Sequence, residues 1–391
     1  MHVLHVTPYF APAFVYGGPP RNILALCHGL QTAGVGVEVV TTVANGAADL
    51  PASTSGGQAA DMYEGVQVHY ARRAFPRIAF NAAVTDPICT ALARADLCHI
   101  HGLWTVPAWR AARAAQQLGV PFIVSPRGML QPAALGHRPW RKRLAFELLD
   151  RHHLMAAVRV HATAEEEAAV LRRLVDPTRV VTIPNGVDLT GAEGAQPGAR
   201  VRLGIPPGDP LIVFLGRLHP IKRLDLLVDA IALVRQQHAT ATLVLAGPDE
   251  GGLAPMASQL TRLGPAIKIP GALQDAEKWA LLREATALVM CSDSENFGTA
   301  VVEAMAVGCP AVVTHTCPWR EVADENCGFW VPQNSRSIAD AISSLIADPI
   351  LATSMGTRGA RLARTRYDWR RIGAAMAACY SDALLVKRQV A

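Results

Sequence analysis

The sequence predicts an α/β protein made of two doubly wound parallel-sheet domains. Short segments rich in β-branched residues alternate with longer amphipathic segments along the whole chain, as in successive βαβ units. The chain has 391 residues, whereas a single hydrophobic core rarely grows beyond about 250–300 residues. Half of the residues are hydrophobic and 18% are charged, which is typical of a well-packed globular protein.

The first half of the chain contains six segments with the composition of buried strands. Amphipathic segments between them are long enough for helices. A small, polar and Gly-rich segment at 45–65 is expected to be a loop. The expected strands are 3–6, 37–43, 66–70, 97–100, 122–125 and 158–162, and the helices between them include 21–33 and 106–118.

The second half repeats this alternation. The five expected strands are 211–216, 241–247, 267–271, 287–292 and 311–314, with helices at 223–237 and 298–308.

A Gly- and Pro-rich segment at 186–210 predicts the connection between the two domains. We therefore expect an N-terminal domain over 1–190 and a C-terminal domain over 205–367. Helical periodicity continues after the second domain without a new strand. The stretch 368–391 is thus expected to form a helix that crosses back to the first domain.

Composition narrows the partners and the compartment. The net charge is +5, and neither half has the basic excess of a nucleic-acid-binding protein, so no nucleic-acid partner is expected. The eight cysteines form no CxxC pair and are interpreted as reduced core residues. No signal-peptide pattern and no apolar run of about 18 residues is found. We expect a cytoplasmic protein that contacts membranes at most peripherally, at the inner face.

Two acidic residues mark the first candidate loop, which follows the expected strand at 287–292. Glu295 lies in the loop and Glu303 in the helix after it. Carboxylates accept hydrogen bonds from paired sugar hydroxyls, and the N–H groups of Phe297, Gly298 and Thr299 at the helix start suit an anion. This loop therefore predicts a ligand that combines a polyol with an anion.

A second candidate loop, at 215–225, also leads from a strand into a helix. Arg217 and Lys222 lie there, where a diphosphate can rest over the helix start. Basic residues are common near helix starts, so the prediction of a diphosphate site depends on the combination with the acidic loop.

The loop after the first strand carries Gly17 and Gly18, which allow a ligand to approach the backbone closely. No GxGxxG sequence follows any expected strand, which counts against a nicotinamide or flavin cofactor. We expect no cofactor.

Two further residues of the first domain are candidates by their position at strand ends. His101 ends the strand at 97–100 and is nearer the expected ligand edge than His99, whose expected role is structural. No acidic or cysteine ligand set accompanies these histidines, so no metal site is expected. Arg127 follows the strand at 122–125.

A cluster of basic residues with Trp140, in 136–148, suits either an anionic lipid surface or simply a solvated helix start. The sequence alone does not decide between the two.

These residues together resemble the retaining glycosyltransferases of the family 4 group. The matching segments are Glu295 to Glu303 with the E-x7-E pattern, Gly216-Arg217 with Lys222, and IPNGVD at 183–188. The resemblance covers nearly the whole chain. It implies a GT-B fold, with two Rossmann-like domains facing a central cleft and no required metal. The acceptor would bind mainly to the first domain and the nucleotide sugar mainly to the second.

The resemblance also implies roles for individual residues. Glu303 would bind the ribose hydroxyls and Glu295 the donor sugar, with the amides of Phe297 and Gly298. Arg217 and Lys222 would neutralise the diphosphate, which Gly18 would approach from the first domain. The backbone around Pro270 would touch the base, and His101 would contact the sugar near the reacting carbon. One departure is Arg223, where many members have glycine.

The expected function is therefore retaining transfer of a hexosyl group from a nucleoside-diphosphate sugar to a glycan or lipid-linked acceptor, in cell-surface polysaccharide assembly. A GT-B nucleotide-sugar epimerase and a non-catalytic sugar-nucleotide sensor are the alternatives. A sugar-transfer assay separates the enzyme from both. A Rossmann oxidoreductase is disfavoured because the glycine fingerprint is missing.

Overall fold

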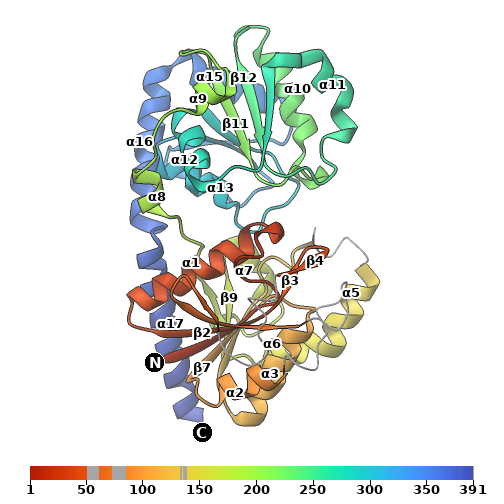
Figure 1. The fold of residues 1–391 in the computed structure, drawn as a ribbon, viewed down its shortest axis with the longest axis vertical. Coiled ribbons are helices and arrows are strands. Elements are labelled where there is room, and N and C mark those ends of the chain that lie inside the picture. The colour runs from red at the N-terminus through yellow and green to blue at the C-terminus, as the bar shows by residue number, and fades with distance from the viewer. Residues whose placement is uncertain (51–60, 73–84, 133, 135–138, 391) are drawn as a thin grey trace. The chain divides into compact units, whose positions relative to one another are not determined.

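The computed structural model describes residues 1–50, 61–72, 85–132, 134 and 139–390 (Figure 1). Within this part, the chain forms two compact units. The first contains Met1–Gly186 together with Trp369–Ala391, and the second contains Val187–Asp368. Each unit is an α/β sandwich around its own sheet, and each is described separately below.

The first unit is built on an eight-stranded sheet with the order β10-β9-β8-β7-β1-β2-β6-β5. All neighbours pair in parallel except β5 and β6. The strands are β1 (His2–Val6), β2 (Gly36–Thr42), β5 (Asp61–Tyr63), β6 (Val66–Ala71), β7 (Leu97–His101), β8 (Phe122–Ser125), β9 (Arg159–Ala162) and β10 (Val180–Thr182), while β3 (Ala44–Asn45) and β4 (Ala48–Asp49) form a separate hairpin.

Helices cover both faces of this sheet. On one face α1 and the C-terminal helix α17 lie side by side (Figure 1), and apolar residues of both, such as Leu30 and Met376, belong to one buried cluster with β1 and β2. On the other face α2 and α3 pack over Leu4 and Ile100. The helical segments are α1 (Gly18–Thr32), α2 (Thr85–Leu92), α3 (Val106–Leu118), α5 (Pro139–Ala145), a π-helical turn η4 (Phe146–Asp150), α6 (Arg151–Ala156), α7 (Glu165–Leu171) and α17 (Trp369–Val390), with short 3₁₀ turns at η1 (Phe14–Tyr16) and η5 (Pro177–Arg179).

The second unit has a fully parallel six-stranded sheet with the order β13-β12-β11-β14-β15-β16. In chain order this is 3-2-1-4-5-6, the doubly wound arrangement whose ligands bind beyond the carboxyl ends of the strands, where the winding reverses. That point lies between β11 and β14. The strands are β11 (Leu211–Leu215), β12 (Thr242–Ala246), β13 (Ile267–Gly271), β14 (Ala287–Met290), β15 (Ala311–Thr314) and β16 (Gly328–Val331).

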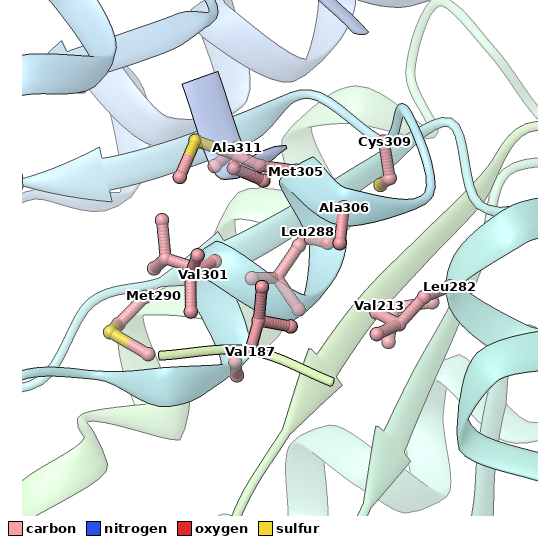
Figure 2. Packing of buried hydrophobic residues seen from close by; sticks show 14 of the residues in the cluster. Val187, Val213, Leu282, Leu288, Met290, Val301, Met305, Ala306, Cys309 and Ala311 are labelled. Carbon is pink, nitrogen blue, oxygen red and sulfur yellow. The ribbon is translucent and has the colours of Figure 1, made fainter. Parts of the chain in front are cut away.

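Two buried clusters hold helices to the faces of this second sheet. Figure 2 shows one of them, in which Val301 and Met305 of α13 meet Leu288 and Met290 of β14. The opposite face packs against α10 and α15. The helices are α8 (Leu189–Glu193), α9 (Ala199–Leu203), α10 (Leu224–Val234), α11 (Ala257–Leu263), α12 (Asp275–Glu284), α13 (Thr299–Ala306), α14 (Glu321–Asp324), α15 (Ser335–Ala347) and α16 (Pro349–Arg366), with 3₁₀ turns η6 (Pro220–Lys222), η7 (Ala254–Met256) and η8 (Gly264–Ala266).

All eleven expected strands are present in the structure, with ends shifted by at most two residues. Three of the four edge strands, β5, β10 and β16, were missed, whereas the edge strand β13 was predicted. β10 has three residues and β16 four, too few to show a period. The expected loop at 45–65 is wrong at its flanks, which form β3, β4 and β5, whereas its centre at 51–60 lies outside the described residues.

The Gly- and Pro-rich segment 186–210 contains two short helices rather than only loop. Asp188 begins α8, because its carboxylate accepts hydrogen bonds from the backbone N–H groups of Thr190 and Gly191. Among the described residues, no single helix is long and apolar enough to cross a membrane. One bent pair, α15 with α16, reaches that threshold only by length and composition.

Candidate active site

The two candidate loops of the second unit both lie at the point where its winding reverses. The loop after β11 begins at Gly216, whose φ of 150° lies in a region that favours glycine. It packs so closely against Gly247, after β12, that a side chain at Gly247 would overlap the Gly216 carbonyl. Two glycines thus allow the backbones of neighbouring loops to touch at this edge.

Arg217 and Lys222 follow in this loop, and each has an acidic partner. Nη1 of Arg217 lies 2.5 Å from Oε2 of Glu250, and both side chains are partly exposed to solvent. Lys222 ends the short helix η6, where the His219 side chain accepts a hydrogen bond from the backbone N–H of Ile221. Glu250 was not predicted from the sequence.

Lys222 pairs with Glu295, so the structure brings together two residues predicted from different loops. Nζ of Lys222 lies 2.5 Å from Oε1 of Glu295, and the two side chains are only 14% and 12% exposed. The Ser292 hydroxyl donates to the same carboxylate oxygen at 2.8 Å. The cation expected for a diphosphate is therefore held by the carboxylate expected for the sugar.

Arg223 shows how the loop tolerates the absence of glycine at that position. Its φ is 51°, in the left-handed region that glycine favours. Nε and Nη2 of its guanidinium donate to the Asp225 carboxylate, and Nη1 donates to Asp293. The hydrogen bonds to Asp225 and then to Asp293 raise the pKa of Arg223. Arg223 keeps a glycine-like backbone here, and its side chain ties this loop to the loop after β14.

The start of α13 is where the sequence predicted it. Gly298 has a φ of 78°, and a Cβ there would lie 2.8 Å from Sδ of Met290. The Phe297 ring is buried against the Trp319 ring, with centroids 5.1 Å apart, and the Trp319 indole N–H donates to the Phe297 carbonyl. The ring and the carbonyl of Phe297 are both engaged, so the predicted role in ligand binding falls to its backbone N–H, ahead of the first helical residue, Thr299.

Glu303 has a partner that the sequence did not indicate. Its Oε1 accepts from Nζ of Lys278 on α12 at 2.8 Å, and the two side chains are 16% and 17% exposed. Lys278 also lies 3.4 Å from Asp275 and 4.4 Å from the centroid of the Trp279 ring. Pro270 lies on the edge strand β13, partly exposed. Both predicted carboxylates are therefore paired with a lysine each.

In the first unit, Gly17 and Gly18 form the start of α1. Gly17 caps the helix with a φ of 81°, and Gly18 is its first residue. Among the described residues, a Cβ on Gly18 would come within 4 Å of the Asn22 side chain alone, at 3.7 Å. The close approach of a ligand to this backbone stays a prediction.

His101 is buried at the end of β7, and both of its ring nitrogens are engaged. Nε and Nη2 of Arg127 each lie 3.2 Å from its Nδ1, and its Nε2 lies 2.9 Å from Nδ1 of His5. A guanidinium can only donate, so Nδ1 of His101 accepts and its proton lies on Nε2, which donates to His5. The structure therefore brings His101 and Arg127 together and adds His5, which the sequence did not single out.

Four buried histidines, His5, His99, His101 and His161, are here called the histidine group, and burial keeps them neutral. Desolvation lowers the pKa of His5 to about 3 and that of His161 to about 4, and it lowers the pKa of His99 and His101 well below the usual value. Nδ1 of His99 bonds to the Tyr380 hydroxyl of α17 at 2.7 Å, in keeping with a structural role.

His5, His99 and His101 offer nitrogen atoms within 4.8 Å of one another, so a metal site has to be considered. A neutral imidazole that binds a metal through Nε2 carries its proton on Nδ1. Nδ1 of His101, however, already accepts hydrogen bonds from Arg127, whose positive charge also opposes a second cation. The donor set as arranged does not suit a metal ion.

Two α/β units, each with candidate loops at the carboxyl ends of its parallel strands, define a GT-B fold. Comparison with solved structures gives the same fold. The HepE protein of Anabaena, solved with UDP and glucose, matches 98% of this chain and 100% of its own, with a TM-score of 0.76 and 20% identity. WaaG, a glycosyltransferase involved in lipopolysaccharide biosynthesis, matches 96% of this chain and 99% of its own, with a TM-score of 0.69 and 16% identity.

Sequence comparison gives the family. Residues 196–362 match the family described as glycosyl transferases group 1, and residues 17–186 match the glycosyl transferase 4-like domain. A D-inositol 3-phosphate glycosyltransferase of Streptomyces bingchenggensis is 32% identical over 308 residues, which cover 74% of this chain and 67% of that protein. One from Catenulispora acidiphila is 28% identical over 97% of this chain and 94% of its own. The chain belongs to the group 1 glycosyltransferases of the family 4 type.

Proposed function

We propose that this glycosyltransferase moves a hexosyl group from a nucleoside-diphosphate sugar to a glycan or lipid-linked acceptor, with retention of configuration at the anomeric carbon. The observation that carries the proposal is the Lys222–Glu295 pair at the reversal point of the second sheet. In this proposal the second unit binds the donor and the first unit the acceptor. HepE was solved with UDP, which supports a nucleoside diphosphate as part of the donor proposed here.

Cleavage of the sugar–phosphate bond builds negative charge on the departing diphosphate. We assign its stabilisation to Arg217, Lys222 and the N–H groups at the start of α13, so that no metal ion is required. Glu295, Phe297 and Gly298 are proposed to hold the sugar. His101 is proposed to contact the sugar near the reacting carbon, and in this structure its ring reaches a ligand only by exchanging one of its two present partners.

The proposed ribose contact of Glu303 gives a direct test. Replacing Glu303 by alanine is expected to weaken binding of the nucleoside diphosphate about tenfold or more, because hydrogen bonds to a charged group contribute about 1.5–3 kcal/mol. Isothermal titration calorimetry with UDP, GDP and ADP measures this affinity and identifies which base the protein binds. We assign the contact with the base to the backbone near Pro270.

Glu193→Ala is the control, because Glu193 is well exposed on α8 and its ion partner among the described residues, Arg364, is 3.7 Å away. Equal affinity of wild type and Glu303→Ala for every nucleotide would contradict the ribose contact. A transfer assay that yields product without epimerising the free nucleotide sugar supports a transferase over an epimerase.

We place the reaction in the cytoplasm, in assembly of a cell-surface polysaccharide, with peripheral contact at the inner face of the membrane. The support is a run of exposed apolar side chains over α5 to α6, here called the α5–α6 surface: Trp140, Leu144, Leu148, Leu149 and Met155. Arg143 and Arg151 are exposed on the same helical segments, and Arg151 pairs with the Glu147 carboxylate at 2.8 Å. An apolar surface with basic neighbours suits an anionic lipid interface.

Not all of the predicted basic cluster is available for lipids. Lys142 bonds to the Ala134 carbonyl and lies 5.2 Å from the Trp104 ring centroid. Arg138 lies outside the described residues.

Binding to vesicles tests the α5–α6 surface. Wild type is expected to float with vesicles of phosphatidylglycerol and phosphatidylcholine but not with phosphatidylcholine alone, and Leu148→Ser is expected to lose most of this binding. Ile350→Ser is the matched control, since Ile350 is 83% exposed in the second unit. Flotation of Leu148→Ser at the wild-type level, or loss in both variants, would contradict the assignment.

A further inference from the structure

Arg127 stands out by its backbone conformation. Its φ is 53°, in the left-handed region, where a residue other than glycine costs about 1–2 kcal/mol. The neighbouring Gly128 also has a positive φ. Glycine at position 127 would be easier for the backbone, so the reason for arginine there lies in its side chain. Strained residues of this kind cluster at functional sites.

The guanidinium of Arg127 has no carboxylate partner among the described residues. Its two hydrogen bonds within the described part of the chain, from Nε and Nη2, both go to the neutral ring of His101. Glu167 is the acidic residue with the largest effect on the pKa of Arg127. The Glu167 carboxylate, however, accepts from the backbone N–H of Gly128 at 2.5 Å and from the N–H and hydroxyl of Thr163 at 2.9 and 3.2 Å.

Arg127 is nevertheless a cation at neutral pH. Burial lowers its pKa only to about 10, three units above neutrality. The surrounding imidazoles of His5, His99 and His161 are neutral and supply no negative charge. Arg127 is partly withdrawn from water, and such a cation without a paired carboxylate is costly. An anionic ligand is one way to offset that cost.

The free edge of the guanidinium is fixed in direction. Nε and one N–H of Nη2 are taken by His101, which leaves Nη1 and the second N–H of Nη2, a pair that suits two oxygens of one anion. His101 is itself held by Nδ1 of His5 across the paired strands β1 and β7. Arg127 follows β8, beside β7, so this edge lies where ligands of doubly wound sheets bind.

We propose that Arg127 binds a phosphate group of the acceptor, and that His101 positions the guanidinium for it. The proposal rests on the proposed function, since it places the acceptor on the first unit. It narrows the acceptor to one that carries a phosphate near the accepting hydroxyl.

The test is a titration of the full-length protein with inorganic phosphate, with saturating UDP present to occupy the proposed donor site. Wild type is expected to bind phosphate, and Arg127→Gln is expected to bind it at least tenfold more weakly. Arg173→Gln removes the same charge from an exposed position and is expected to bind like wild type. Unchanged affinity in Arg127→Gln, or no phosphate binding by wild type, would overturn the proposal, and so would stronger binding of acetate than of phosphate.

Two His101 variants test the positioning role. His101→Asn keeps a hydrogen-bond acceptor where Nδ1 lies and is expected to retain phosphate binding. His101→Phe removes this acceptor and is expected to lose phosphate binding. The melting temperature of the UDP-bound protein is expected to be unchanged in His101→Phe. Equal phosphate affinity in His101→Phe and wild type would overturn this part. UDP binding is measured first and separately. Failure to bind any nucleoside diphosphate would refute the donor site, while the phosphate titration would still report on Arg127.

Discussion

Replacing Lys222 by alanine is expected to lower the rate of sugar transfer about 100-fold or more, with the fold intact. Loss of one preorganised group that stabilises developing charge typically costs about 10²–10³ in rate. Removal of Lys222 has a second effect. In the wild-type structure Nζ of Lys222 lies 2.5 Å from the Glu295 carboxylate, so the variant leaves this carboxylate as an uncompensated charge next to the proposed diphosphate position. Steady-state transfer from the donor that binds in calorimetry measures the loss.

Arg217→Ala is expected to reduce transfer at least tenfold, and less than Lys222→Ala. The Arg217 side chain is 42% exposed, so water screens its charge more than that of Lys222. Lys268→Ala, on the edge strand β13, serves as a control for loss of a positive charge in the same unit. Turnover close to wild type in both Lys222→Ala and Arg217→Ala, with normal thermal unfolding, would refute the diphosphate assignment.

Ion pairs between site residues suggest how the side chains of the proposed donor site are oriented in the absence of ligand. Each charge proposed for the donor site has an opposite charge within 2.8 Å: Lys222 and Glu295 pair with each other, Glu303 with Lys278 and Arg217 with Glu250. A nucleoside-diphosphate sugar offers phosphates to the cations and hydroxyls to the carboxylates, so binding replaces or shares these partners. Each charge is thus oriented before the ligand arrives, which reduces the reorganisation needed during reaction.

The sequence predicted the central strands and located the two candidate loops for a common reason. Buried parallel strands are continuous apolar runs, and the polar residues that end them stand out, as Arg217 does after β11 and Glu295 after β14. Edge strands such as β10 and β16 are short, and their pairing partners rather than their composition make them strands.

The partners of the site residues could not be predicted in the same way. Lys278, Glu250 and His5 lie in segments whose local pattern is that of an ordinary helix, loop or strand. Their roles come from contacts across the sheet edge, such as Lys278 of α12 with Glu303 of α13. Arg127 was identified by its position after a strand. Its left-handed backbone, and its lack of a carboxylate partner within the described part of the chain, are properties of the folded chain.

The contact between α1 and α17 gives the largest expected effect on stability. Gly29 and Gly373 face each other there, and a Cβ on Gly373 would overlap the backbone of Gly29. Helix propensity alone would make Gly373→Ala stabilising by about 1 kcal/mol. Overpacking a core costs about 1–3 kcal/mol or more, and here the obstacle is backbone, which cannot turn aside as a side chain can.

The overlap therefore outweighs the propensity, and we expect Gly373→Ala to lower the free energy of unfolding by about 2 kcal/mol and the melting temperature by about 5 °C. Ala374→Gly, at an exposed position of the same helix, calibrates the propensity and should cost about 1 kcal/mol. A Gly373→Ala protein that melts at or above the wild-type temperature would show that the two helices separate easily. Because α17 also supplies Tyr380 to His99, separation of α17 from α1 should disturb the histidine group and lower the phosphate affinity proposed for Arg127.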